Sequence, residues 1–358
     1  MDYLKRVEKL RQELNERSFE ALIIDKPIDL MYLSGMELSL GRLFLSPTEC
    51  ILFVDGRYFE DCQENCPFQV LNSQDNAFLE HIKKSQLKSL AFDSAYTSHQ
   101  NYLHLKKNLQ CELLAWACPL KVSRLKKDTQ EIDILRKAAD LGSRGYDLGV
   151  SLLKIGVSEI EIAQKIEIFW KEHGAIAPSF DINVSFGKNS SKPHHRASEQ
   201  LLKKGDIVLF DIGVNYQHYA SDMTRTLFFG EKDPKLAEIY QIVLQAQEKA
   251  LSLCKKGSRL GDLDKISREH IEKSGYSEYY PHGLGHGIGL EIHESPGIRD
   301  QQADSDMILQ EGMVFTIEPG IYLPGWGGVR IEDSICIKGD SYENFSQRSK
   351  ELMVIDAE

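Results

Sequence analysis

The sequence lacks an excess of basic residues. Its 358 residues include 43 lysines and arginines against 54 aspartates and glutamates, which gives a formal net charge of −11 at pH 7. Binding to nucleic acids or to anionic membranes generally needs a basic surface. The charge balance therefore argues against both classes of partner, and we expect the protein to bind neither nucleic acid nor membrane.

The sequence also lacks an apolar run long enough to span a bilayer, which takes about 20 residues. Its first residues, MDYLKRVEKLRQELNERS, are charged throughout and contain no apolar core of a signal peptide. We therefore expect a cytoplasmic protein.

The cysteines lack the spacing of a thiolate metal site. The chain has seven cysteines. Cys62 and Cys66 form one near pair, and Cys111 and Cys118 form another, but neither pair has a second cluster that would complete a zinc site. We expect reduced, structural thiols.

The first part of the chain has the pattern of a small α/β domain, and the length is sufficient for two domains. Residues 3–17 show helical periodicity of apolar side chains. Short β-like runs follow, with helix-like segments between them, at 21–25, 49–55 and 87–93. We assign this domain to residues 1–121.

Residues 122–358 have the pattern of an α+β domain. It begins with two helical patterns and continues as strands, with one further helical interval. The helices are expected at 129–153, with Asp128 or Thr129 as N-cap, at 158–174 and within about 233–275.

Two carboxylates lie in a predicted hairpin. Asp211 interrupts the apolar run IVLFDIG (207–213), and Asp222 lies in YASDMTRTLFF (219–229), with a turn at VNYQ between them. The spacing places the two carboxylates opposite each other across the strand pair. Ionised carboxylates in apolar strands repel each other, and a multivalent cation would relieve that repulsion. The alternative is a salt bridge from Asp222 to Arg225 and a turn role for Asp211.

Two more acids lie in a second pair of apolar runs, MVFTIEPG and GGVRIEDSICI, which a Gly/Pro loop joins. Glu318 ends the first run. In the second run, Arg330, Glu332 and Ser334 share one face of a strand by their period of two. The alternative to a metal site is an ion pair between a buried glutamate and Arg330.

Three histidines, His282, His286 and His293, lie in the stretch PHGLGHGIGLEIHE (281–294). Four strand-borne carboxylates and one imidazole can form a two-metal ligand set, in which two divalent ions about 3.5–4 Å apart share a hydroxide. Carboxylate-rich ligation without thiols favours Mn²⁺, with Co²⁺ and Zn²⁺ as the other candidates.

Taken together, these motifs resemble those of the pita-bread metallopeptidases, which include aminopeptidase P, prolidase and methionine aminopeptidase. The resemblance covers the whole chain and implies an α/β N-terminal domain followed by an α+β pita-bread (creatinase/aminopeptidase-like) catalytic domain. It also implies five metal ligands. They match the FDxG, SDxTRT, GHGIG, TIEPG and VRIED motifs at Asp211, Asp222, His286, Glu318 and Glu332.

In the family, residues like Asp222 and Glu332 help to hold one ion, and residues like His286 and Glu318 hold the other. The resemblance implies catalytic roles for Glu318 and for two cleft histidines, His194 in PHHRAS and His293 in HESP. Arg330 is expected to orient the metal-binding carboxylates. The roles of His195 and His282 stay open.

The resemblance implies an exopeptidase that hydrolyses the Xaa-Pro bond at peptide N-termini, as aminopeptidase P does, by attack of a metal-bridging hydroxide. A prolidase that accepts only Xaa-Pro dipeptides is the alternative. Methionine aminopeptidase and a non-catalytic peptide-binding module are more remote alternatives. The expected partner is a peptide with proline at its second position, and the family also suggests a homodimer.

Overall fold

The computed structural model describes residues 1–357, apart from the side chain of Asp75. The chain forms two compact units, one that ends at Arg124 and one that begins at Leu125. The predicted boundary near residue 121 falls at the start of the short helix α6 (Lys121–Leu125). Within the described residues, every helix is too short or too polar to cross a membrane.

The N-terminal unit is built on a six-stranded mixed sheet with the strand order β4-β3-β2-β1-β5-β6. Strand β1 runs parallel to β5 and antiparallel to β2. The strands are β1 (Leu22–Ile24), β2 (Arg42–Leu45), β3 (Cys50–Val54), β4 (Gln69–Asn72), β5 (Ser89–Phe92) and β6 (Glu112–Ala115). The helices are α1 (Tyr3–Glu16), α2 (Pro27–Ser34), α3 (Phe59–Asn65), η1 (Gln74–Asn76), α4 (Ala77–Lys84) and α5 (His99–Asn108).

The predicted α/β class of this unit is confirmed. Helix α1 and strands β1, β3 and β5 match the predicted segments. Strands β2, β4 and β6, of four residues each, were not among the predicted segments. The sheet packs its apolar side chains, such as Ile23, Phe44 and Phe53, against those of α4 and α5, such as Phe78 and Leu105.

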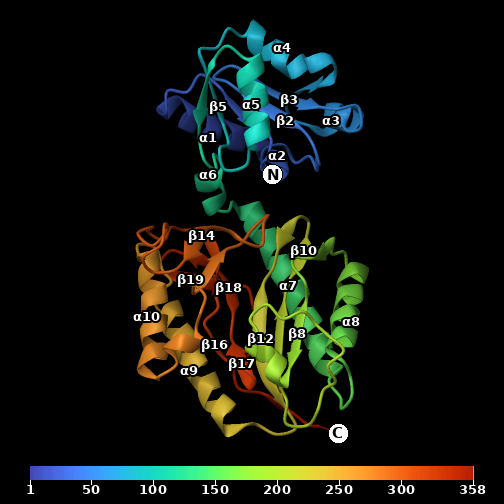
Figure 1. Ribbon diagram of the computed structural model, residues 1–358, viewed down its shortest axis with the longest axis vertical. Helices are drawn as coiled ribbons and strands as arrows, with labels where there is room; N and C mark the ends of the chain where they lie inside the picture. Colours follow the sequence, from blue (N-terminus) through green and yellow to red (C-terminus); the bar gives the residue numbers. More distant parts are fainter. Residues whose placement is uncertain (358) are drawn as a thin grey trace. The chain divides into compact units, whose positions relative to one another are not determined.

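The second unit has two halves, each a pair of helices on a sheet (Figure 1). In the first half, α7 (Thr129–Ser151) and α8 (Glu159–Glu172) cover a four-stranded sheet, and Ile166, Trp170 and Phe210 are buried between them. That sheet has the order β20-β12-β9-β8, with β8 (Asn183–Phe186), β9 (Ile207–Ile212), β12 (Met223–Phe229) and β20 (Val354–Ile355).

In the second half, α9 (Pro234–Leu251) and α10 (Leu260–Lys273) pack against a five-stranded sheet with the order β14-β13-β15-β18-β19. Its strands are β13 (Gly285–Gly287), β14 (Glu294–Ile298), β15 (Val314–Ile317), β18 (Asp333–Lys338) and β19 (Ser341–Asn344). Two smaller sheets and two 3-10 helices complete the unit: β7 (Ala177–Pro178), β10 (Val214–Tyr216), β11 (Tyr219–Ala220), β16 (Gly320–Leu323), β17 (Gly327–Arg330), η2 (Gly187–Ser191) and η3 (Ser277–Tyr279).

Two of these helices begin close to their predicted starts, one at the predicted cap Asp128 and the other after Ser158. Asp128 and Ser158 each accept a hydrogen bond from the backbone three residues on, and the glutamate there bonds back, which forms a capping box. The predicted helical interval 233–275 is two helices, because the chain turns at Gly257 with a φ of +92°.

The predicted hairpin at residues 207–229 is correct in its strand pairing but not in its register. Strands β9 and β12 are antiparallel, yet Asp211 faces Thr224 rather than Asp222. The reason is that the connection is longer than a turn: VNYQ enters β10, which pairs with β11. Asp222 therefore lies just before β12.

The second predicted hairpin is interrupted. Strand β15 pairs with β18, whereas β17 ends at Arg330 and pairs with β16 in a separate ladder. Glu332 lies in the short connection between β17 and β18. Arg330, Glu332 and Ser334 nevertheless all contact the chain at residues 222–224, as a shared face would require.

Candidate metal centre

The predicted site residues line one cavity of about 280 Å³ in the second unit. Asp211 comes from β9 and His286 from β13. The other three proposed ligands lie at strand ends or in connections, where the backbone can turn a side chain inward. The cavity lining includes all eight predicted residues, namely Asp211, Asp222, His286, Glu318, Glu332, His194, His293 and Arg330.

Three of these residues form a compact donor cluster. Asp222, His286 and Glu332 each offer a ligand atom, and these atoms lie within 4.8 Å of one another. The Nε2 atom of His286 is 3.5 Å from Oδ2 of Asp222 and 3.4 Å from Oε1 of Glu318. The structure therefore brings the imidazole between carboxylates from two different segments.

Two buried oxygens in the cluster support a bound cation. Oδ1 of Asp222 and Oε1 of Glu332 have no hydrogen-bond partner among the residues that the structure describes. The other oxygen of Glu332, Oε2, accepts a hydrogen bond from the Thr224 hydroxyl at 2.6 Å. Unpaired buried acceptors are rare in folded proteins, and a divalent ion would satisfy both, so this donor set fits a metal.

The carboxylates repel one another in the absence of a cation. Burial, together with the neighbouring charge of Glu332, raises the pKa of Asp222 well above its usual range. Burial and the charge of Glu318 raise the pKa of Glu332 in the same way. Burial also raises the pKa of Glu318 to about 7. A positive charge would stabilise the ionised carboxylates, and the side chains of the site supply only part of it.

Arg330 supplies part of that positive charge by forming an ion pair with Asp211. Its Nη2 atom forms an ion pair with Oδ2 of Asp211, and its Nε atom donates to the Thr224 hydroxyl at 2.9 Å. The two alternatives considered above are not what the structure shows, since Arg330 pairs with Asp211 rather than Glu318, and Arg225 pairs with Asp333 rather than Asp222.

His282 is linked to Arg330 through a tyrosine. Its Nδ1 atom lies 2.8 Å from the Gly283 carbonyl oxygen. Because a carbonyl oxygen can only accept a hydrogen bond, Nδ1 carries the proton. Its Nε2 atom must then accept from the Tyr322 hydroxyl at 2.9 Å, and that hydroxyl accepts from Nη1 of Arg330 at 2.9 Å. Burial lowers the pKa of His282 to about 4, so the ring is neutral at neutral pH.

His286 is oriented in a similar way. Its Nδ1 atom bonds the Gly287 carbonyl at 3.0 Å, which leaves Nε2 free to act as a ligand. A Cβ atom on Gly285 would lie 2.0 Å from the carbonyl oxygen of Thr316, and one on Gly287 would lie 2.2 Å from that of Ser295. Only glycine allows β13 to lie this close to its neighbours.

The remaining histidines divide between the cavity and the protein interior. The His293 ring packs edge-on against His286, with 4.3 Å between the ring centroids, and burial lowers its pKa. His194 lines the cavity. His195 instead bonds the buried Glu159 at 2.8 Å, so the structure assigns it a contact that the sequence did not indicate.

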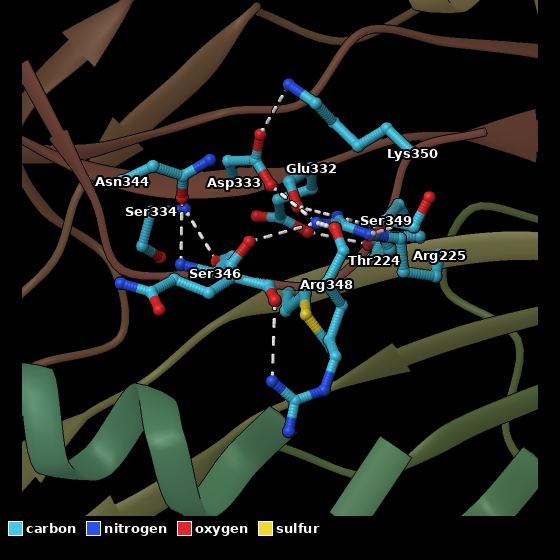
Figure 2. A network of polar contacts seen from close by, with 12 residues as sticks. Thr224, Arg225, Glu332, Asp333, Ser334, Asn344, Ser346, Arg348, Ser349 and Lys350 are labelled. Atoms are coloured by element: carbon cyan, nitrogen blue, oxygen red, sulfur yellow. Dashed lines mark hydrogen bonds and ion pairs between the residues drawn. The ribbon is translucent and has the colours of Figure 1, made fainter. Parts of the chain in front are cut away.

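A buried arginine holds the backbone around Glu332 (Figure 2). The Arg225 guanidinium donates to the Asp333 carboxylate at 2.7 Å and to the Glu332 carbonyl at 2.6 Å. It also donates to carbonyls of the C-terminal segment at Ser346, Arg348 and Ser349. Arg225 and Asp333 are both almost fully buried. This network ties the connection that carries Glu332 to β12.

Sequence reasoning missed the contacts of three residues around the site: Thr224 and Arg225 bond Glu332, and Tyr322 bonds Arg330. Thr224 follows Asp222 by two positions, so the period of two could have placed both on one face. Arg225 was considered only as a partner of Asp222. Tyr322 had no local signal, because its position depends on the separate ladder of β16 and β17.

Comparison with known proteins places this site in a family. Residues 133–339 match the model of metallopeptidase family M24, and residues 6–120 match the creatinase/prolidase N-terminal domain. The chain belongs to the M24 metallopeptidases, and the predicted pita-bread catalytic domain with an α/β N-terminal domain is confirmed.

Individual relatives cover nearly the whole chain. The chain is 36% identical to an Xaa-Pro dipeptidase of Pyrococcus furiosus over 98% of this chain and 99% of that protein. The solved structure of an Xaa-Pro dipeptidase from Bacillus anthracis matches with a TM-score of 0.94 at 34% identity, over 99% of this chain and 100% of that one. An X-Pro aminopeptidase from Thermotoga maritima matches with a TM-score of 0.88 at 30% identity, over 98% and 100% of the two chains.

The raised pKa of Glu318 predicts a pH-dependent effect of Glu318→Gln in the metal-free protein. The wild-type carboxyl contributes stability below its ordinary pKa of 4.5 and loses it as the pH rises through about 7. The stability of E318Q relative to wild type should therefore increase from pH 4.5 to pH 8, by on the order of 3 kcal/mol. Denaturant unfolding in the presence of a chelator measures this difference, and titratable groups that do not contact Glu318 cancel because both proteins contain them. The exposed variant Glu311→Gln is the control, and a difference that stays flat with pH would contradict the assignment.

The Figure 2 network predicts that Arg225→Met is strongly destabilising. It removes the guanidinium from the buried Asp333, which keeps the partly exposed Lys350 as a charged partner, and breaking a buried ion pair costs about 3–5 kcal/mol. Arg348→Met is a matched control, since its ion pair with Asp147 is 27% and 50% exposed and should contribute less than about 1 kcal/mol. Urea unfolding compares the two variants. Equal losses would show that the Arg225 network is not the stabilising element.

Proposed function

We propose that this chain is a metal-dependent Xaa-Pro dipeptidase, that is, a prolidase. The observation that carries the proposal is the buried cluster of Asp222, His286 and Glu332, with two unpaired oxygens, at the wall of a small cavity. Relatives named Xaa-Pro dipeptidase match almost the full chain. They favour the alternative raised by the sequence over its first expectation, aminopeptidase P.

The size of the cavity also supports a short substrate. At about 280 Å³ it lies at the lower end of the range for ligand pockets. Because the chain is also similar to an X-Pro aminopeptidase, an enzyme that accepts longer peptides is the second candidate. Both candidate enzymes cleave the Xaa-Pro bond, in which the proline has no N–H and a fixed φ.

We propose Asp211, Asp222, His286, Glu318 and Glu332 as the ligands of two divalent ions. The carboxylate-rich donor set without thiols favours Mn²⁺ over Co²⁺ or Zn²⁺. When bound, two such ions would supply an activated water at neutral pH and a positive charge that polarises the scissile carbonyl.

The chain's own residues then handle protons and orientation. Glu318 can take up a proton and return it to the leaving proline nitrogen. His293 donates to the oxygen that develops negative charge. His194 contacts the peptide on its proline side. Arg330 holds Asp211 in place. Homodimer formation and a cytoplasmic location remain predictions of the sequence.

A substrate panel distinguishes the candidate functions. The Mn²⁺-loaded protein should hydrolyse Ala-Pro with a kcat/KM at least about tenfold higher than that for Ala-Pro-Ala. Such a preference needs only about 1.4 kcal/mol of differential transition-state binding. The protein should leave Met-Ala intact. Chromatography of the released amino acids measures this. Faster cleavage of Ala-Pro-Ala would favour the aminopeptidase, cleavage of Met-Ala a methionine aminopeptidase, and no cleavage at all a binding module.

Glu318→Gln should abolish turnover without loss of the fold. Removing a general acid–base group lowers kcat by about 10²–10⁴-fold, and the amide also lacks the charge that would hold an ion. Steady-state hydrolysis of Ala-Pro and circular dichroism measure the two properties, with Glu311→Gln as the control. A variant that keeps a near-normal rate would show that Glu318 has neither role.

A further inference from the structure

A second buried carboxylate lies outside the set that lines the cavity. Glu159, the first residue of α8, is fully buried. Its Oε1 atom accepts from the Phe186 backbone N–H at 2.7 Å and from the Asn189 amide at 2.9 Å. Its Oε2 atom accepts from the His195 Nε2 at 2.8 Å and from the Ser198 N–H and hydroxyl at 3.0 and 2.6 Å.

These five hydrogen bonds explain how a carboxyl group tolerates full burial. They also share an origin, since all the donors come from one segment, residues 186–198. That segment runs from the end of β8 through η2 and into the following loop. The carboxylate therefore fixes the segment near both of its ends.

His194 lies within the segment that Glu159 fixes. Its neighbour His195 turns toward Glu159 with a side chain only 10% exposed, whereas His194 is exposed and lines the cavity. The carbonyl of Pro193 additionally accepts from Nη1 of Arg330 at 3.4 Å. The backbone on both sides of His194 is thus held, by Glu159 through His195 and by Arg330 through Pro193.

We propose that Glu159 and His195 are positioning residues for the hydrolytic reaction. They anchor residues 186–198 so that the His194 ring faces the peptide. The proposal rests on the proposed function, in which His194 contacts the proline side of the substrate, and it assigns a role to a histidine and a glutamate that lie behind the cavity wall.

Glu159→Gln tests the anchor with little change in volume. The amide nitrogen cannot accept, so the donors that face it lose their acceptor and the segment must move. A displacement of about 1 Å near reacting groups can cost about 10²-fold in rate. We expect kcat/KM for Ala-Pro to fall at least about tenfold, mainly through KM, with Mn²⁺ affinity unchanged. Glu161→Gln is the matched control, because that side chain caps the same helix at Ser158.

A double-mutant cycle shows whether Glu159 acts through His194. Glu159→Gln should lower kcat/KM at least about tenfold in the wild-type background and less than about twofold in a His194→Ala background. Equal losses in both backgrounds would overturn the proposal. Should E159Q fail to fold, His195→Ala and His195→Gln replace it: the first should lower activity, and the second should restore it, because the glutamine amide can donate as Nε2 does. If the two have equal activity, the proposal fails.

A spectroscopic measurement separates this proposal from the proposed function. In protein labelled with ¹⁵N-histidine, Glu159→Gln should shift or broaden the His194 ring signal, which is identified by its loss in H194A, and leave the His293 signal in place. An unchanged His194 signal would overturn the positioning role. Failure of the wild-type protein to cleave any Xaa-Pro peptide would instead count against the proposed function.

Discussion

Mutual repulsion among buried carboxylates is the constraint on which the catalytic unit depends. Asp211, Asp222, Glu318 and Glu332 line one small cavity, and burial would drive such groups toward their protonated forms. The pKa of Glu318, raised to about 7, and the unpaired oxygens of Asp222 and Glu332 are consequences of this crowding. A fold would not maintain such a cluster for stability, which is why it indicates chemistry.

Side chains outside the cluster offset part of this electrostatic repulsion. Arg330 neutralises Asp211 and donates to Thr224, which in turn donates to Glu332. Behind this layer, the fully buried pair of Arg225 and Asp333 fixes the connection that carries Glu332. Each half of the unit thus contributes one ligand from a strand, Asp211 from β9 and His286 from β13, and a helix pair packs against each sheet.

The four carboxylates could be picked out from the sequence because each interrupts or ends an apolar run, and the resemblance to a known family added His194, His286 and His293. The register could not be predicted. Asp211 faces Thr224 because residues 214–216 form a strand of their own, and periodicity cannot show how long a connection remains extended. Contacts between distant segments, such as the link from His282 through Tyr322 to Arg330, have no local signature at all.

The central claim is that the carboxylate cluster holds two divalent ions. Calorimetric titration of the metal-free protein with Mn²⁺ at pH 7.5 tests it most directly. The account predicts two ions per wild-type chain, fewer or much weaker sites in Asp222→Asn, and no change in Asp181→Asn, whose carboxylate is 69% exposed. Absence of binding to the wild-type chain, or equal binding to all three proteins, would contradict it.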